Sequence, residues 1–140
     1  MLKGIPKNVS PELLKVLCEM GHGDEIVIAD ANFPSTSIAK VLVRLDGQSG
    51  EKVLDSVLKL SPLDTYAPSN MMYMETTAGD PTPEIWESYE KIANKRDKNV
   101  KISQIERQAF YDRARKAYAV IATGEEKIYA NVIIKKGVIK

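Results

Sequence analysis

The residues best suited to chemistry begin with the single histidine of the chain, His22, which lies between Gly21 and Gly23. Glycine on both sides gives the backbone access to dihedral angles closed to other residues and leaves the imidazole uncrowded. A histidine can both give and take a proton near neutral pH. A short apolar run follows and ends in a carboxylate, Asp30. This pattern indicates proton-transfer chemistry on a small polar molecule.

Two further pairs of polar residues lie near the C-terminus. Arg107 and Tyr111 are four residues apart on an expected helix, so their side chains share one face. Tyr129 and Asn131 are two residues apart on an expected strand and also share a face. The opposite face of that strand is apolar and suits the core: Ile128, Ala130, Val132 and Ile134. We therefore expect the phenol and the amide on the polar side, where they could bind hydroxyl groups.

Each of these residues also has a purely structural interpretation. His22 could fill a loop, and Asp30 and Asp64 could close turns or cap helices. Arg107 could form a surface ion pair with a nearby glutamate. The two tyrosines and the asparagine named above could equally serve the fold. Spacing alone leaves these alternatives open.

Short β-branched or apolar runs alternate with amphipathic helices along the chain. Helices are expected from Ser10-Pro11, from Ser49, from near Pro83 and over residues 107–116. Strands are expected at residues 25–30, 41–45, 71–75, 102–105, 118–123 and 127–135. The Gly124-Glu125 turn should join the last two strands. The sequence thus predicts one α/β domain over residues 1–140, a mixed β-sheet flanked by helices with a C-terminal β-hairpin.

Composition excludes several classes of function. The chain has 20 Lys and Arg and 19 Asp and Glu, so its net charge is only +1. This charge creates no broad electrostatic field that would favour binding to nucleic acid or an anionic membrane. One cysteine and one histidine cannot build a closed zinc site, and no glycine-rich phosphate loop is present, so we expect no metal and no cofactor. Cys18 should be a buried small hydrophobe, with a reactive thiol as the alternative. No run suits a secretion signal or a membrane span, so we expect a cytoplasmic protein.

Longer motifs carry a resemblance to a known family. The most specific is the block MGHGDEIVIADANFP at residues 20–34. The others include LKGI at 2–5, SPELL at 10–14, RLDG at 44–47, LDTY at 63–66, IER at 105–107, FYDRA at 110–114, ATGE at 122–125 and YAN at 129–131. In these motifs the chain resembles the fucose mutarotase family, in the superfamily that also includes the D-ribose pyranases.

The resemblance implies roles for seven residues. Three match catalytic residues of family members: His22, the proton donor, and Asp64 and Tyr111, which act in animal members. Four match residues that bind sugar: Asp30, Arg107, Tyr129 and Asn131. Relatives usually carry glycine at the position of Ala130. Because the side chain of Ala130 should point to the core, we expect little effect there.

A member of this family would be a cofactor-free isomerase that interconverts the α and β pyranose anomers of L-fucose. Ring opening needs a proton delivered to the ring oxygen and another removed from the anomeric hydroxyl, which a histidine with a carboxylate or phenol could supply. One alternative is a ribose pyranase-like enzyme, although its second site histidine is absent here. Another is a non-catalytic monosaccharide-binding protein. Family members form homo-oligomers, often decameric rings, with sites near subunit contacts.

Overall fold

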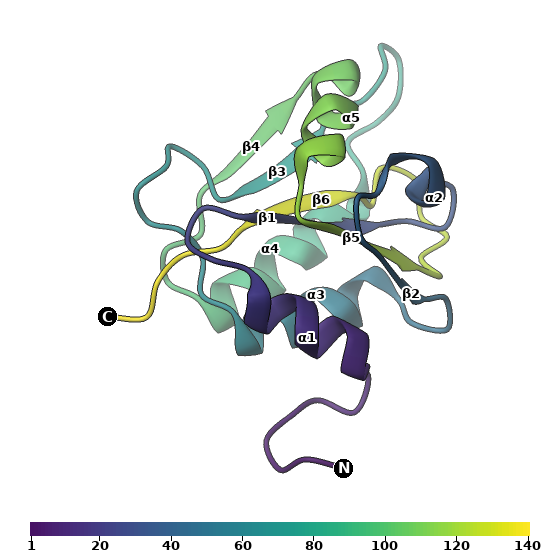
Figure 1. Ribbon diagram of the computed structural model, residues 1–140. Helices are drawn as coiled ribbons and strands as arrows, with labels where there is room; N and C mark the ends of the chain where they lie inside the picture. Colours follow the sequence, from purple (N-terminus) through teal and green to yellow (C-terminus); the bar gives the residue numbers. More distant parts are fainter.

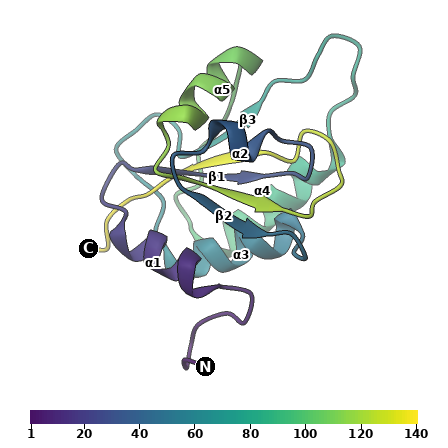
Figure 2. The ribbon, with the colours of Figure 1, turned by 45° about the vertical axis from the view of Figure 1, so that its right-hand side comes forward.

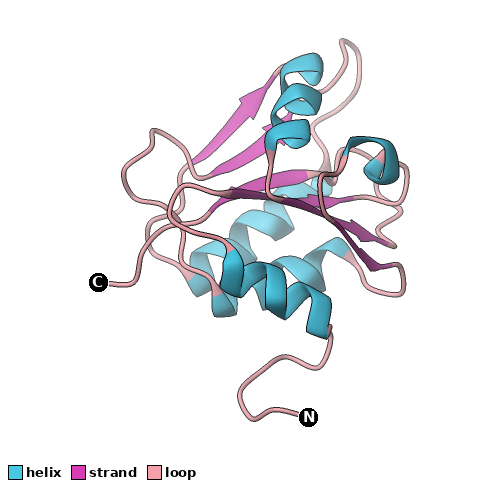
Figure 3. Cartoon of the chain, in the orientation of Figure 1, coloured by secondary structure: helices cyan, strands magenta, loops and turns pink.

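A six-stranded β-sheet, in the order β2-β5-β1-β6-β3-β4, lies at the centre of the protein. The computed structural model describes all residues 1–140. The strands are β1 (Glu25–Ala29), β2 (Leu42–Leu45), β3 (Met71–Met74), β4 (Ile102–Ile105), β5 (Ala119–Thr123) and β6 (Val132–Lys135). One face is covered by α1 (Pro11–Glu19), α3 (Gly50–Leu60) and α4 (Glu84–Arg96), and the other by α2 (Ser35–Ile38) and α5 (Arg107–Lys116) (Figures 1 and 3). None of these helices is long and apolar enough to cross a membrane.

All strands except β6 point the same way. β2 pairs in parallel with β5, β5 with β1, and β3 with β4, whereas β6 pairs antiparallel with β1 and β3. The carboxyl ends of the parallel strands therefore meet the amino end of β6 at one edge, the carboxyl edge; the opposite edge is the amino edge. The predicted mixed sheet is confirmed. The predicted hairpin is confirmed in direction, because β5 and β6 run antiparallel, but β1 lies between them, so they do not pair with each other.

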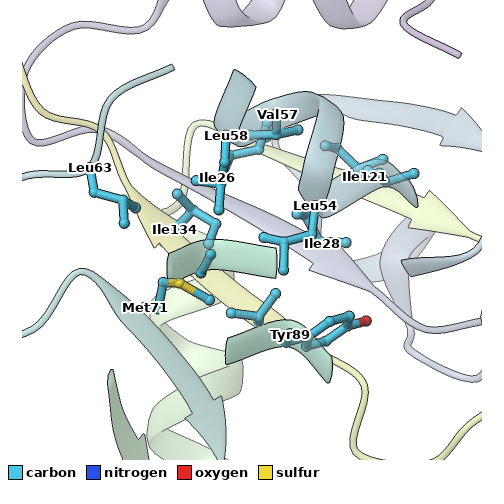
Figure 4. Close-up of a cluster of buried hydrophobic side chains, with 14 of the residues drawn as sticks. Ile26, Ile28, Leu54, Val57, Leu58, Leu63, Met71, Tyr89, Ile121 and Ile134 are labelled. Atoms are coloured by element: carbon cyan, nitrogen blue, oxygen red, sulfur yellow. The ribbon is translucent and has the colours of Figure 1, made fainter. Parts of the chain in front are cut away.

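The two faces of β1 pack against different hydrophobic clusters. Ile26 and Ile28 face the larger cluster, which includes side chains of α1, α3 and α4, whereas Val27 and Ala29 face the smaller cluster with α5. This alternation follows from the two-residue period of a strand. Figure 4 shows the larger cluster, in which side chains of α3 and α4 pack against those of β1. All four side chains are at most 1% exposed, so β1 firmly positions the residues that precede and follow it.

Local capping starts the helices where the sequence predicts. The Ser10 side chain accepts a hydrogen bond from the backbone N–H of Leu13 (3.1 Å), and Pro11 begins α1. Ser49 caps α3 in the same way. Glu106 caps α5, because its carboxylate accepts hydrogen bonds from two backbone N–H groups of the first turn, at 2.9 and 3.0 Å. These hydrogen bonds hold the pKa of the Glu106 carboxyl below its ordinary value.

Three local predictions are wrong. Cys18 is exposed rather than buried. The buried stripe of this region passes through Leu13, Val16, Leu17 and Met20. Ile128 is 61% exposed, because β6 begins only at Val132 and the strand alternation does not extend back that far. Tyr129 and Asn131, expected on the strand at residues 127–135, precede β6 instead, and Tyr129 has a positive φ that a strand does not adopt.

Candidate functional site

A carboxylate and an amide are buried side by side at the carboxyl edge. Asp30 directly follows β1 and Asn131 directly precedes β6, and the two strands are paired. The Asn131 amide donates a hydrogen bond to the Asp30 carboxylate (3.1 Å), and its oxygen accepts one from the Asp30 backbone N–H (2.7 Å). Burial raises the pKa of Asp30, although several hydrogen bonds favour the charged form. The reciprocal contact fixes the orientation of both side chains.

A cavity of about 290 Å³ opens beside this pair, and we call it the carboxyl-edge pocket. It is lined by Asp30, Asn32, Phe33, Met74, Asp80, Arg107, Tyr111, Ile128, Tyr129 and Asn131. Its volume is near the lower end of the roughly 300–1,000 Å³ typical of small-molecule sites. Carboxylate, guanidinium and amide groups can hydrogen-bond to hydroxyl groups, while the apolar side chains suit C–H surfaces. The pocket therefore suits a small polyhydroxylated molecule.

The start of α5 brings Arg107 and Tyr111 to this pocket. As their spacing predicts, the two side chains share a face: the Arg107 guanidinium donates to the Tyr111 hydroxyl at 3.4 Å and lies 5.6 Å from the ring centre. The Phe33 ring, with its centre 5.7 Å from that of Tyr111, adds an apolar surface. Because 3.4 Å is long for a hydrogen bond, the guanidinium can turn its donors toward a ligand.

Tyr129 has the most constrained backbone in the pocket. It is the one non-glycine residue with a positive φ (57°), a conformation that costs roughly 1 kcal/mol or more. Two aromatic donors from α4 hold it, since Trp86 Nε1–H donates to the Tyr129 carbonyl and the Tyr89 hydroxyl to the Ala130 carbonyl, each at 2.8 Å. Ala130 is buried, as the sequence predicts. The Tyr129 phenol donates to the carboxylate of Asp80.

The histidine singled out from the sequence lies at the amino edge. His22 precedes β1, in a turn where Gly23 has a φ of 87°. Its Nε2 is 2.8 Å from Oδ1 of Asp64, whose side chain is 2% exposed, whereas the imidazole is 45% exposed. Burial alone would raise the pKa of Asp64, but hydrogen bonds from His22 and from backbone N–H groups hold it below its ordinary value. An ionised Asp64 accepts a hydrogen bond from Nε2–H, so the other ring nitrogen, Nδ1, keeps the lone pair that can take a proton.

The amino-edge pair and the carboxyl-edge pocket lie at opposite ends of β1. The five residues of this strand alone span about 13 Å, at roughly 3.3 Å per residue. Because a hydrogen bond joins heavy atoms about 3 Å apart, His22 does not reach a ligand held beside Asp30 of the same chain. The structure brings together five of the residues singled out from the sequence: Asp30, Arg107, Tyr111, Tyr129 and Asn131. His22 and Asp64 form a separate group, so the seven residues singled out from the sequence do not form one cluster within a single chain.

A second cavity, of about 580 Å³, shares Asp30 with the pocket. Its polar lining comes mainly from α2 and from the ends of β2 and β5. The cation there, Arg44, is already matched by Asp46, to which it donates at 3.1 and 2.8 Å. Since none of the other residues singled out from the sequence lines this cavity, we take the smaller one as the candidate site. No group of three or more His, Cys, Asp or Glu side chains is arranged to hold a metal ion.

Sequence reasoning did not identify Asp80, Thr77 or Ile128 at the site. The backbone N–H of Thr77 donates to the Tyr129 phenol at 3.0 Å. Residues 77–83 contain a glycine and two prolines, a composition typical of an ordinary loop, so nothing in the sequence marks the aspartate among them. Ile128, expected in the core, lines the pocket instead. Only the path of the folded chain brings these three residues to the site.

The mixed sheet and the polar pocket at its carboxyl edge define an α/β protein with a site for a small polar ligand. The chain belongs to the RbsD / FucU transport protein family, whose model matches residues 3–139. It is 49% identical to the fucose mutarotase of Mus musculus, over 97% of this chain and 94% of that protein. The crystal structure of the fucose mutarotase from Streptococcus pneumoniae, in complex with L-fucose, matches with a TM-score of 0.95 and 51% identity over 99% of this chain and 100% of that one. RbsD of Bacillus subtilis, complexed with D-ribose, shares the fold at a TM-score of 0.76 and 23% identity, over 100% of both chains.

Proposed function

We propose that the protein is an L-fucose mutarotase, an isomerase that interconverts the α and β pyranose anomers without a cofactor. The observation that carries this proposal is the full-length likeness, in sequence and structure, to a fucose mutarotase solved with L-fucose. The carboxyl-edge pocket supports it, because its size and mixed lining suit one monosaccharide. We further propose that residues 1–140 act as one mutarotase domain in the cytoplasm, where the single thiol would stay reduced.

In the proposed reaction, a proton is delivered to the ring oxygen O5 and another is removed from the O1 hydroxyl. The aldehyde then rotates, and the ring recloses as the transfers run in reverse. His22 Nδ1 exchanges one of these protons, while Asp64 holds Nε2–H and stabilises the imidazolium when it forms. Tyr111, in the pocket, is the second group for proton transfer. Sugar binding falls to Asp30, Arg107, Tyr129 and Asn131.

A second copy of the chain supplies the histidine in this proposal. The support is the separation of His22 from the pocket along β1, since one chain does not bring both to the same ligand. The amino edge of one copy would then lie against the carboxyl edge of its neighbour. The imidazole is 45% exposed and therefore accessible for such a contact.

Exposed apolar side chains support this contact between unlike edges. Tyr66 is 68% exposed, and its ring centre lies 5.3 Å from that of His22. Val138 and Ile139 are also exposed on the C-terminal segment that follows β6 from the amino edge. Ile128 is exposed at the carboxyl-edge pocket. A contact between two different surfaces repeats head to tail and forms a ring where its rotation closes. We propose such a ring-shaped homo-oligomer, with a decamer as the assembly to test.

Saturation-transfer NMR on the anomeric protons tests the proposed activity. The protein should accelerate exchange between the two anomers of L-fucose more than exchange of D-ribose or galactose. Acceleration should disappear in His22→Ala. L-fucose binding without faster exchange would contradict the enzyme and leave the monosaccharide-binding alternative, whereas faster pyranose–furanose exchange of D-ribose would favour the ribose pyranase-like alternative.

Mixing two inactive variants tests whether the site is shared. His22→Ala keeps an intact pocket, and Asp30→Ala keeps an intact imidazole. If neighbouring copies complete each other's sites, unfolding and reassembling an equal mixture should restore about a quarter of the wild-type exchange rate, since each half of a site comes from a random copy. A mixture as inactive as its components would exclude a shared site.

A further inference from the structure

The phenol of Tyr129 already uses two of its hydrogen-bonding positions within the chain. Its O–H donates to the carboxylate of Asp80, and its oxygen accepts from the backbone N–H of Thr77 at 3.0 Å. A phenol has only one proton to donate. Toward a ligand in the carboxyl-edge pocket, Tyr129 is therefore left as an acceptor.

Both partners belong to the loop of residues 75–83 between β3 and α4, which projects beyond the sheet (Figures 1 and 2). Gly79, with a φ of 93°, allows the turn in which the Asp80 N–H donates to the Thr77 carbonyl at 3.0 Å. The contacts to Tyr129 are the only hydrogen bonds that residues 76–82 make with the rest of the chain. The position of this loop beside the pocket thus depends on one phenol.

We propose that Asp80 is a positioning residue of the sugar site. Its carboxylate accepts a hydrogen bond from the phenol O–H, which leaves the Tyr129 oxygen as an acceptor for a sugar hydroxyl. The same hydrogen bond holds the loop beside the pocket. The proposal rests on the proposed sugar-binding function. It predicts that the ligand meets Tyr129 through a hydroxyl donor, while the guanidinium of Arg107 supplies donors from the other side of the pocket.

The backbone of Tyr129 explains why such a fastening matters. The Trp86 ring N–H donates a hydrogen bond to the Tyr129 carbonyl and fixes the backbone, so the phenol can move only by rotation of its own side chain. Without Asp80, the O–H is free to rotate and can offer a donor where the sugar also offers one. Two donors cannot satisfy each other, so the correct orientation of the phenol contributes directly to sugar affinity.

The test compares Asp80→Ala, Asp80→Asn and Tyr129→Phe with Glu75→Gln, which alters an exposed carboxylate at the start of the same loop. Asp80→Ala should raise both the Kd and the KM for L-fucose about tenfold, the upper range for one lost neutral hydrogen bond. Asp80→Asn should recover most of this loss, because its amide oxygen can accept the phenol proton. Glu75→Gln should behave as the wild type.

A double variant separates positioning from a general effect on the loop. Asp80→Ala added to Tyr129→Phe should change the Kd by less than about twofold, because the partner through which Asp80 acts is already gone. A further tenfold loss in that background, or an Asp80→Ala Kd equal to that of the wild type, would overturn the proposal. Titration calorimetry gives these Kd values independently of the catalytic rate. The proposed function has its own test: it would be contradicted if the wild-type protein did not accelerate anomer exchange, whatever the Kd values of the Asp80 variants.

Discussion

The two edges of the sheet each bury one aspartate, yet their surroundings shift the two carboxyl groups in opposite directions. Asp30 is 6% exposed and Asp64 is 1% exposed. Burial is the largest influence on both and raises the pKa in each case. The Asp30 carboxylate accepts hydrogen bonds only from the Asn131 amide and from backbone N–H groups, and its pKa remains raised. Asp64 also receives the ring N–H of His22, and its pKa is lowered. The hydrogen bond from the His22 ring is the largest of the influences that lower the pKa of Asp64.

This contrast assigns different work to the two edges. The carboxyl edge combines side chains that follow β1, β3 and β4 with those that precede β6, and together they form a pocket that can hold a ligand. The amino edge joins an imidazole to the buried carboxylate of Asp64 through a hydrogen bond. Variants of Asp30 and Asn131 at the carboxyl edge should therefore act mainly on binding, and variants of His22 at the amino edge mainly on turnover.

His22→Ala should have the largest effect and should act on turnover alone. We expect kcat for L-fucose anomer exchange to fall by about 10²–10⁴-fold, because the imidazole moves a proton in the proposed mechanism and its removal leaves the carboxyl-edge pocket intact. Asn131→Ala should instead raise KM by at least about tenfold, since it leaves buried groups of Asp30 without a partner. Exchange NMR over a range of fucose concentrations yields both constants.

A rise in KM of similar size in both variants would contradict the division between the edges. Cys18→Ser is a suitable control, because Cys18 is exposed and lies outside the pocket and the imidazole pair. Its kcat and KM should equal those of the wild type.

Gly50→Ala should damage the carboxyl edge from a distance. A Cβ at this position would lie 2.1 Å from the Tyr89 hydroxyl, which donates to the Ala130 carbonyl next to Tyr129. We expect the free energy of unfolding to fall by about 1–3 kcal/mol, as for other overpacked cores. Gly47→Ala is the matched control, since its Cβ would have no neighbour within 4 Å. Urea denaturation measures the loss, and unchanged stability of Gly50→Ala would refute the packing argument.

The sequence allowed the local elements at both edges to be predicted, because their signals are local. The apolar, β-branched run before Asp30 predicts a buried strand, and Ser10-Pro11 predicts the start of α1. The four-residue spacing of Arg107 and Tyr111 predicts their contact. Each of these inferences depends on residues within one or two helical turns.

The relation between the edges was harder to predict, because it depends on strand order. A turn between β5 and β6 favours a hairpin, but the sequence does not reveal that β1 lies between them. The contact of His22 with Asp64 likewise joins turns 42 residues apart. One part was open to inference: His22 precedes β1 and Asp30 follows it, so the two had to lie at opposite ends of that strand.

Trp86→Phe tests how the backbone of the carboxyl edge is held. Phenylalanine can keep the stacked contact with Tyr73, whose ring centre is 4.8 Å away, but it cannot donate to the Tyr129 carbonyl. We expect a loss of about 1 kcal/mol in the free energy of unfolding and a higher KM for L-fucose. Tyr118→Phe removes a hydroxyl that donates to Glu19 at 2.7 Å, away from the pocket, and should leave KM unchanged. If both variants gave the wild-type KM, the Trp86 hydrogen bond would not position Tyr129.

The acid limb of the stability curve provides the finest comparison of the edges. The folded-state pKa of Asp64 is below its ordinary value of 3.8, so its contribution to stability is complete above that pH and is lost as the pH falls through the lowered pKa. The pKa of Asp30 is raised, so the penalty for its charge is relieved as the pH falls through the raised value toward 3.8. Melting temperatures between about pH 2 and pH 6 should therefore fall less steeply in Asp64→Asn than in the wild type, and more steeply in Asp30→Asn. Both variants retain the surface carboxyl groups whose pKa is also lowered, such as Asp55 beside Arg96, so only the difference between the variants reports on the two edges. Acid limbs of equal slope in the two variants would mean that the imidazole does not set the two buried aspartates apart.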